Sequence, residues 1–93
     1  MATVELAAAA VEDLDTLILP ADSRARVAHS LRSLERFPRL GPALTGRWIG
    51  LRFILGPWRW MLLVYTYIEA DDRVVVVTIQ DAQSSAAATA RRG

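Results

Sequence analysis

The sequence predicts a small α+β domain in which a helical hairpin packs on one face of an antiparallel-dominated sheet. Helix-type patterning fills the first half of the chain, whereas strand-type patterning fills residues 46–80. A short strand candidate, Thr3–Leu6, precedes the helices. These three observations predict the element order β-α-α-β-β-β.

The chain has 93 residues, which suffice for one small domain and not for two. We expect this domain to span residues 1–83, with a flexible tail over 84–93. The chain has no cysteine, which excludes disulfides and thiolate metal sites and favours a reducing cytoplasm. Its longest apolar run is far shorter than the roughly 20 residues of a membrane span. We therefore expect a cytoplasmic protein without a membrane partner.

Two segments carry the apolar spacing of amphipathic helices. The first is expected over residues 7–19 and ends before Pro20, and the second begins at Asp22 or Ser23 and runs to about Phe37. The predicted buried stripes consist of Val11, Leu14, Leu17, Ile18, Val27, Leu31 and Leu34. Because only a few residues separate the two helices, they should form an antiparallel hairpin.

Three strands are predicted over residues 46–54, 58–68 and 73–80. A tight turn at Gly56-Pro57 would pair Phe53 with Trp58 and place Arg52 opposite Arg59. Two facing guanidinium groups repel each other, so this pair favours a bound anion.

Strand alternation then divides the side chains into two faces. One is expected to meet the helices and contains Ile49, Leu51, Phe53, Trp60, Leu62, Val64, Val75, Val77 and Ile79. The other is expected to be an open binding surface and contains Trp48, Gly50, Arg52, Arg59, Met61, Leu63, Tyr65 and Tyr67.

All eleven basic residues are arginines, and the stretch from Arg24 to Arg59 holds eight of them against one acid, Glu35. This stretch is strongly cationic and suited to bidentate phosphate contacts, although codon bias is an equally good explanation of arginine without lysine. A lone histidine, His29, has no partner at ligand spacing and is best explained as a solvated or packed side chain. The sequence has no glycine-rich phosphate loop and no Ser-His-Asp or zinc-helix motif, and we expect neither metal nor cofactor.

The order and spacing of several short motifs resemble the RelE/ParE superfamily of bacterial type II toxins. The resemblance runs from Val4 to about Gln83 and depends on AVEDLDTL, VAHSLRSLERFPRLG, LTGRWIGLRF, PWRWMLLVYTY and VVVVTIQDA. It implies a toxin neutralised by a cognate antitoxin, with which it can form a hetero-oligomer. RelE-like members cleave messenger RNA on the ribosome without metal, by means of basic residues on the sheet.

On this resemblance, Arg59 and Arg52 are the expected catalytic residues, with Arg59 as a phosphate clamp. Substrate contacts are expected from Arg47, Trp48, Tyr65 and Gln83, and antitoxin contacts from Met61, Leu63 and Tyr67. The sequence departs from the family's ribonucleases at Gln83, where they carry a basic residue. Three functions therefore stay open: ribosome-dependent mRNA cleavage, non-enzymatic poisoning of DNA gyrase as in ParE-like members, and a weakly toxic member that mainly binds antitoxin.

Overall fold

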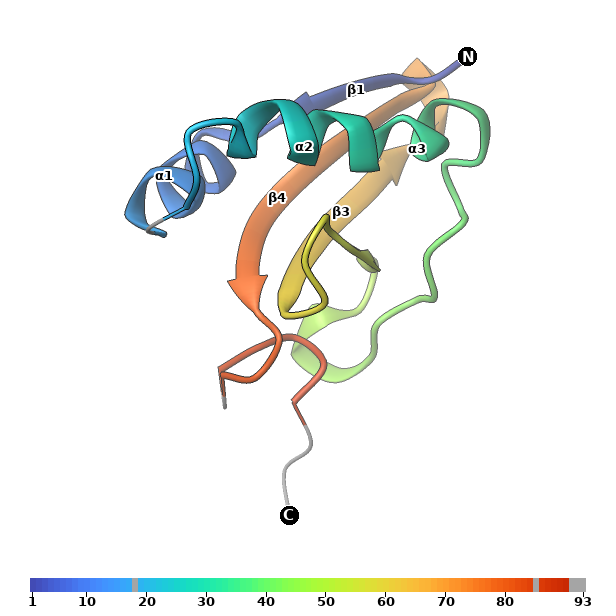
Figure 1. Cartoon of the computed structure of the whole chain (residues 1–93). Helices are drawn as coiled ribbons and strands as arrows, with labels where there is room; N and C mark the ends of the chain where they lie inside the picture. Colours follow the sequence, from blue (N-terminus) through green and yellow to red (C-terminus); the bar gives the residue numbers. More distant parts are fainter. Residues whose placement is uncertain (18, 85, 91–93) are drawn as a thin grey trace.

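The computed structural model describes residues 1–17, 19–84 and 86–90, and it has the predicted α+β class (Figure 1). Its strands are β1 (Thr3–Leu6), β2 (Arg52–Leu55), β3 (Met61–Ile68) and β4 (Arg73–Asp81). Its helices are α1 (Ala8–Thr16), α2 (Ser23–Leu31) and α3 (Ser33–Arg36), and two 3-10 turns are η1 (Gly46–Trp48) and η2 (Glu69–Asp71). The predicted order of one strand, a helical region and three strands is confirmed. None of the helices in these residues is long and apolar enough to span a membrane.

The four strands form one sheet in the order β1-β4-β3-β2. β1 runs parallel to β4, and the other two pairs, β2 with β3 and β3 with β4, are antiparallel. A bulge interrupts the β3–β4 pairing between Val64 and Tyr65. The first strand, β1, therefore lies at one edge of the sheet, and the last strand, β4, lies beside it in the interior.

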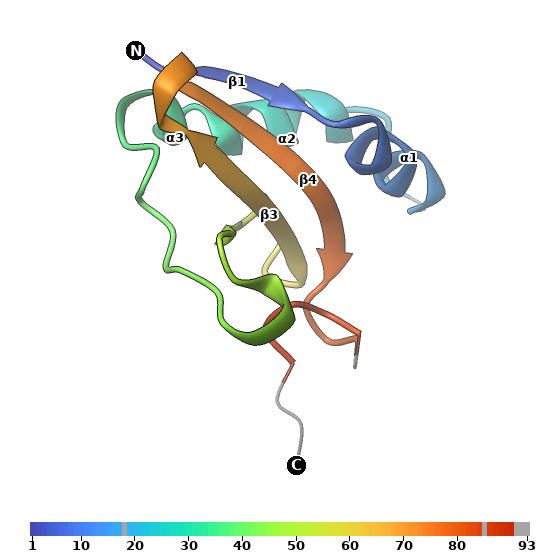
Figure 2. The same ribbon diagram turned by 180° about the vertical axis from the view of Figure 1, so that it is seen from behind.

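The helices cover one face of the sheet, and Figure 2 shows the other face without helices. The covered face forms the main core, whose fully buried members are Ala10, Val27, Leu34, Met61, Leu63, Tyr65, Val74 and Val76. The predicted stripe of the second helix is confirmed, because Val27, Leu31 and Leu34 are all buried. The second helix is divided at Arg32 into α2 and α3, and Ile18 of the first stripe lies outside the described residues.

The other face carries a second apolar cluster that is covered without any helix. Leu62 and Val64 of β3 pack there against Leu44 and the half-buried Trp48 from the segment before β2. Ala87 completes the cover and is 5% exposed. The expected flexible tail thus packs on the sheet over residues 86–90, where the Ala88 amide donates to Gln80 Oε1 at 2.8 Å.

The predicted pairing of the first hairpin is wrong. Arg52 lies opposite Tyr65, and Arg59 lies in the turn between the strands, because β3 begins at Met61. The turn is wide and is closed by the Gly56 amide donating to the Met61 carbonyl at 2.9 Å. Residues 56–60, which include Trp58 and Trp60, all lie in this turn and outside the strands.

The first long strand also begins later than predicted, because residues 46–48 form η1 and residues 49–50 form a turn. Gly46 and Gly50 have φ angles of 65° and 89°. Residues other than glycine rarely adopt these angles, and a strand cannot continue through them. As a result Ile49 is 79% exposed and contributes nothing to the core.

The assignment of the two faces is inverted for most of the strand residues, whereas Trp60 and Ile79 pack in the helix-covered core and Trp48 on the helix-free side, as predicted. Met61, Leu63 and Tyr65 lie beneath the helices, whereas Phe53, Leu62, Val64 and Val77 lie on the helix-free face. Both sets are apolar, so alternation separates them without indicating which set meets the helices.

Candidate functional site

Arg52 holds a loop in place and does not face the helix-free surface. Its Nη1 donates to the Gly41 carbonyl at 2.8 Å and to the Arg39 carbonyl at 3.4 Å. The Gly41 amide donates to the Tyr65 hydroxyl at 3.0 Å. Burial raises the pKa of this hydroxyl, and the Gly41 amide and the Arg52 charge oppose the rise. Arg52 and Tyr65 thereby fix residues 39–44, which we call the edge strap, along β2.

The expected antitoxin contacts Met61 and Leu63 are both 0% exposed beneath the helices, so their prediction as surface residues is wrong. Tyr67 is half-buried and remains partly accessible at the far end of β3. Its hydroxyl donates to Asp72 Oδ1 at 2.7 Å, and the Arg39 guanidinium lies 4.9 Å from its ring centroid. The hydrogen bond to Asp72 raises the pKa of Tyr67.

Arg59 is exposed in the turn before β3, and within the described chain it makes no ion pair. Its neighbours Trp58 and Trp60 stack on each other, with ring centroids 6.1 Å apart. The Arg26 guanidinium lies 5.2 Å from the Trp58 ring and ties the turn to α2. Arg59 is thus a free cation on a turn that aromatic contacts hold in place.

Gln83 lies close to this turn, although the two are distant in sequence. The Ala82 amide donates to the Trp60 carbonyl at 2.6 Å. Gln83 follows Ala82 and Arg59 precedes Trp60, so each is the chain neighbour of a residue in this hydrogen bond. Trp60 and Gln83 line a shallow hollow of about 360 Å³ together with Leu17 and Asp81. The structure therefore brings Gln83 near Arg59 but separates both from Arg52.

Arg47 and Trp48 lie in η1 beside a pocket of about 430 Å³ on the helix-free side. The pocket is lined by Thr45, Gly46, Arg47, Trp48, Ala86, Ala87, Ala88 and Ala90. The Arg47 guanidinium is 5.5 Å from the Trp48 ring centroid. This pocket, which we call the tail pocket, pairs one cation with an aromatic ring and suits an anion or a flat ring.

No imidazole or carboxylate lines the tail pocket among the described residues. The guanidinium group of an arginine donates hydrogen bonds and has no acceptor, so the pocket offers binding groups and no general base. Across the described ranges there is also no cluster of three or more His, Asp or Glu side chains that could hold a metal ion.

Sequence reasoning missed two residues that make close contacts with distant parts of the sheet. Asp13 of α1 accepts hydrogen bonds at the bulge of β4 from Thr78 Oγ1 at 2.6 Å and from the Ile79 amide at 3.0 Å. Gly41 lies so close to β2 that an added Cβ would be 2.0 Å from the Phe53 carbonyl oxygen. Both interactions are long-range, and no local sequence signal marks them.

The sheet order, the parallel first strand and the single helical layer define a RelE-like α+β domain. The chain is similar to the structure of the toxin–antitoxin complex RelBE2 from Mycobacterium tuberculosis, with 25% identity and a TM-score of 0.69. The match covers 86% of this chain and 96% of that chain.

Two Escherichia coli structures are similar over a comparable range. The intact RelBE toxin–antitoxin complex matches with 19% identity and a TM-score of 0.68, covering 90% of this chain and 100% of that chain. The isolated RelE toxin matches with 20% identity and a TM-score of 0.67, covering 92% and 89%. Neither a family model nor a curated protein sequence matches this chain. The resemblance to the RelE/ParE superfamily is thus confirmed by the fold.

Proposed function

We propose that this protein is the toxin component of a type II toxin–antitoxin pair and that a cognate antitoxin neutralises it. The observation that supports this proposal is the match to RelE structures over 86–92% of the chain, two of them toxin–antitoxin complexes. Fold alone does not set activity, so the mechanism must be argued from the exposed side chains.

For the mechanism, we propose that Arg47 and Arg59 bind an anionic target. Both guanidinium groups are exposed, and neither has an acidic partner within the described chain. Ribosome-dependent mRNA cleavage is the first target activity to test, since arginines can clamp a phosphate through paired donors. Cleavage also needs a group that takes a proton from the 2′-hydroxyl, which typically contributes a hundred- to ten-thousand-fold in rate. No imidazole or carboxylate lines the tail pocket among the described residues, so we expect slow cleavage.

A non-catalytic poison of DNA gyrase is the second candidate. It needs a binding surface and no proton transfer, which suits the tail pocket with its one cation, one tryptophan and alanine-rich wall. Under this mechanism the same exposed arginines would contact acidic side chains or DNA phosphate.

Induced expression tests the proposal. We expect growth arrest that co-expression of the neighbouring reading frame relieves. Arg47→Gln and Arg59→Gln should each weaken the arrest, whereas Arg36→Gln, an exposed arginine on α3, is the matched control and should leave it unchanged. Absence of arrest together with absence of any partner complex would contradict the toxin assignment.

The two mechanisms are separated in purified systems. Cell-free translation followed by mapping of mRNA ends should reveal cuts at A-site codons if the protein cleaves mRNA. A gyrase supercoiling assay should be inhibited if it poisons gyrase. Gln83→Arg adds a cation near Arg59 and should increase cleavage under the first mechanism only.

A further inference from the structure

The strongly exposed large apolar side chains of the described residues are unevenly distributed. Phe37 is 61% exposed and Leu40 is 55% exposed, and both belong to residues 37–40, which follow α3 and which we call the corner turn. Met1 lies beside the end of α3, since the Ala2 amide donates to the Glu35 carbonyl at 2.7 Å. Figures 1 and 2 show the N-terminus and the end of α3 at the same corner of the molecule. Three of the five such side chains in the described chain therefore gather at this corner.

The corner turn is held in place by its own backbone and by one of its side chains. The Leu40 amide donates to the Phe37 carbonyl at 2.9 Å, and the ring of Pro38 limits the backbone between them. Arg39 Nη2 lies 3.0 Å from a carboxylate oxygen of Glu69. Exposed apolar side chains on a preorganised backbone lose little conformational freedom when they bind. The corner turn is therefore suited to docking.

The same residues form both a projection and a hollow. Phe37 projects into solvent, and a shallow hollow of about 320 Å³ is lined by Phe37, Pro38, Arg39 and Leu40. In a two-fold dimer a surface contacts its own copy, so each contact occurs twice. A two-fold axis beside the corner turn places Phe37 of each copy over the hollow of the other. Both phenyl rings and both Leu40 side chains then leave water, which favours association.

Charges beside the hollow also suit a second copy of this chain. Arg39 and Glu69 form an exposed ion pair next to it. A two-fold axis brings two such pairs together head to tail, so that each guanidinium also lies near the carboxylate of the other copy. A phosphate or an acidic protein would instead have to compete with Glu69 for Arg39. The formal net charge of +1 leaves little overall repulsion between two copies.

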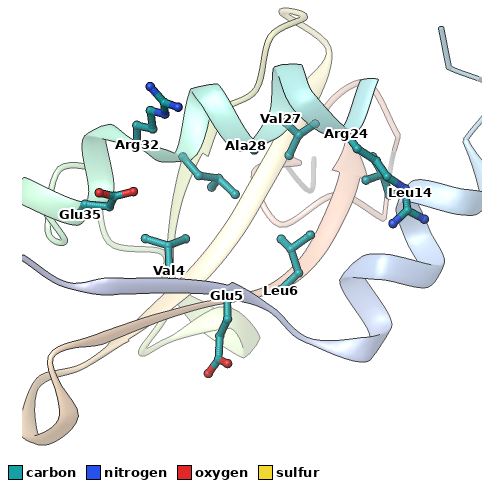
Figure 3. Close-up of a pocket in the computed structure, with 10 residues that line it drawn as sticks. Val4, Glu5, Leu6, Leu14, Arg24, Val27, Ala28, Arg32 and Glu35 are labelled. Carbon is teal, nitrogen blue, oxygen red and sulfur yellow. The ribbon is translucent and has the colours of Figure 1, made fainter. Parts of the chain in front are cut away.

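The edge of the sheet at β1 suits a second copy less well. Within the described residues the strand partner of β1 is β4 alone. Figure 3 shows Val4 and Leu6 pointing from β1 toward α2, while Glu5 points to the opposite side. In an antiparallel pairing of two copies centred on Glu5, the two Glu5 carboxylates would lie opposite each other and repel. No residue of the corner turn lines the groove of about 330 Å³ between β1 and α2, so the two places are separate.

We propose that the corner turn is the contact of a two-fold dimer of this chain, with Phe37 and Leu40 at its centre and the Arg39–Glu69 pairs at its rim. The contact is small, so the dimer dissociates on dilution. The inference does not depend on the proposed function. Neither the residues that line the tail pocket nor Arg59 belong to the corner turn, so a dimer presents two copies of the candidate site.

Sedimentation velocity of the full chain over a concentration series tests the dimer. The weight-average mass should rise from that of one chain toward that of two as the concentration increases from the micromolar to the millimolar range. The mass of a single chain at every concentration would overturn the inference and leave the toxin assignment untouched.

Two exposed apolar residues provide a matched pair of variants that locates the contact. Phe37→Ser should weaken self-association at least about tenfold. Ile49→Ser removes a side chain that is 79% exposed outside the corner turn, and it should change self-association less than about twofold. Circular dichroism verifies that both variants fold. Equal dissociation constants for Phe37→Ser and the parent chain would place the contact elsewhere and overturn the inference.

Reversal of charge tests the rim of the contact. Glu69→Arg places four arginines side by side in the dimer and should weaken self-association at least about fivefold. Combining Arg39→Glu with Glu69→Arg restores alternating charges and should return the dissociation constant to within about twofold of the parent value. A folded double variant that does not recover would overturn the two-fold arrangement. Loss of self-association in Ala28→Tyr, which fills the groove beside β1, but not in Phe37→Ser would place the second copy there and also overturn it.

Discussion

The two faces of the sheet carry similar apolar side chains and are covered in different ways. On one, Leu63 packs under the helices. On the other, Leu62 packs under a glycine-containing loop and an alanine-rich tail segment. Both leucines are at most 1% exposed. Equal burial does not require equal rigidity, and we expect the loop and tail segment to adjust more easily than the helices.

Adjacent leucines of β3 offer the strongest test of this contrast. Leu63→Ala should lower the free energy of unfolding by about 4 kcal/mol, because the helices cannot collapse into the space. Leu62→Ala should cost about 2–3 kcal/mol, since the loop and tail can move inward. Urea denaturation monitored by tryptophan fluorescence measures both. Equal losses would show that the two covers are equally rigid.

Gly41 tests the edge strap, which joins the two covers as it leads from α3 toward η1. Gly41→Ala should cost about 3 kcal/mol, because its Cβ would meet the Phe53 backbone oxygen at 2.0 Å. Gly56→Ala is the control, since its Cβ would be 2.8 Å from the flexible Met61 Sδ, and it should cost about 1 kcal/mol. Thermal unfolding of the two variants distinguishes these values.

Asp13 tests how firmly α1 is attached to the helix-covered face. Asp13→Ala removes the acceptor for Thr78 Oγ1 and the Ile79 amide and should cost about 2 kcal/mol. Glu12→Ala, on the exposed side of the same helix, should change stability by less than about 0.5 kcal/mol. The same loss in both variants would mean that helix propensity and not the bulge contact is responsible.

Tyr65 provides the smallest of these effects. Tyr65→Phe leaves the Gly41 amide without its acceptor and should cost about 1 kcal/mol. Because burial raises the pKa of Tyr65 in the folded state, its contribution is complete below about pH 10 and decreases as the pH rises further. The fall in unfolding free energy above that pH should be smaller in Tyr65→Phe. An identical alkaline fall in both proteins would assign it to other groups.

The order of elements could be predicted from the sequence because it depends on local patterning. Thr3–Leu6 forms its strand, and the stripe through Val27, Leu31 and Leu34 is buried as expected. These features need only alternation, helical spacing and the breaks at proline.

The geometry of the candidate site could not be predicted in the same way. The pairing of Arg52 with Arg59 required a tight turn at Gly56-Pro57, and the wide turn moved the partner of Arg52 to Tyr65. The choice of face was undetermined, since both sets of side chains are apolar. The contacts of Gly41 and of Asp13 join residues that are far apart in the sequence, so no local pattern predicts them.

The pairing of the first strand with the last has a consequence for how the protein is made. Thr3 lies beside Arg73 and Leu6 beside Val76, so the sheet cannot be completed until synthesis has passed Val76. During that interval the opening segment of the nascent chain lacks its neighbour in the finished fold.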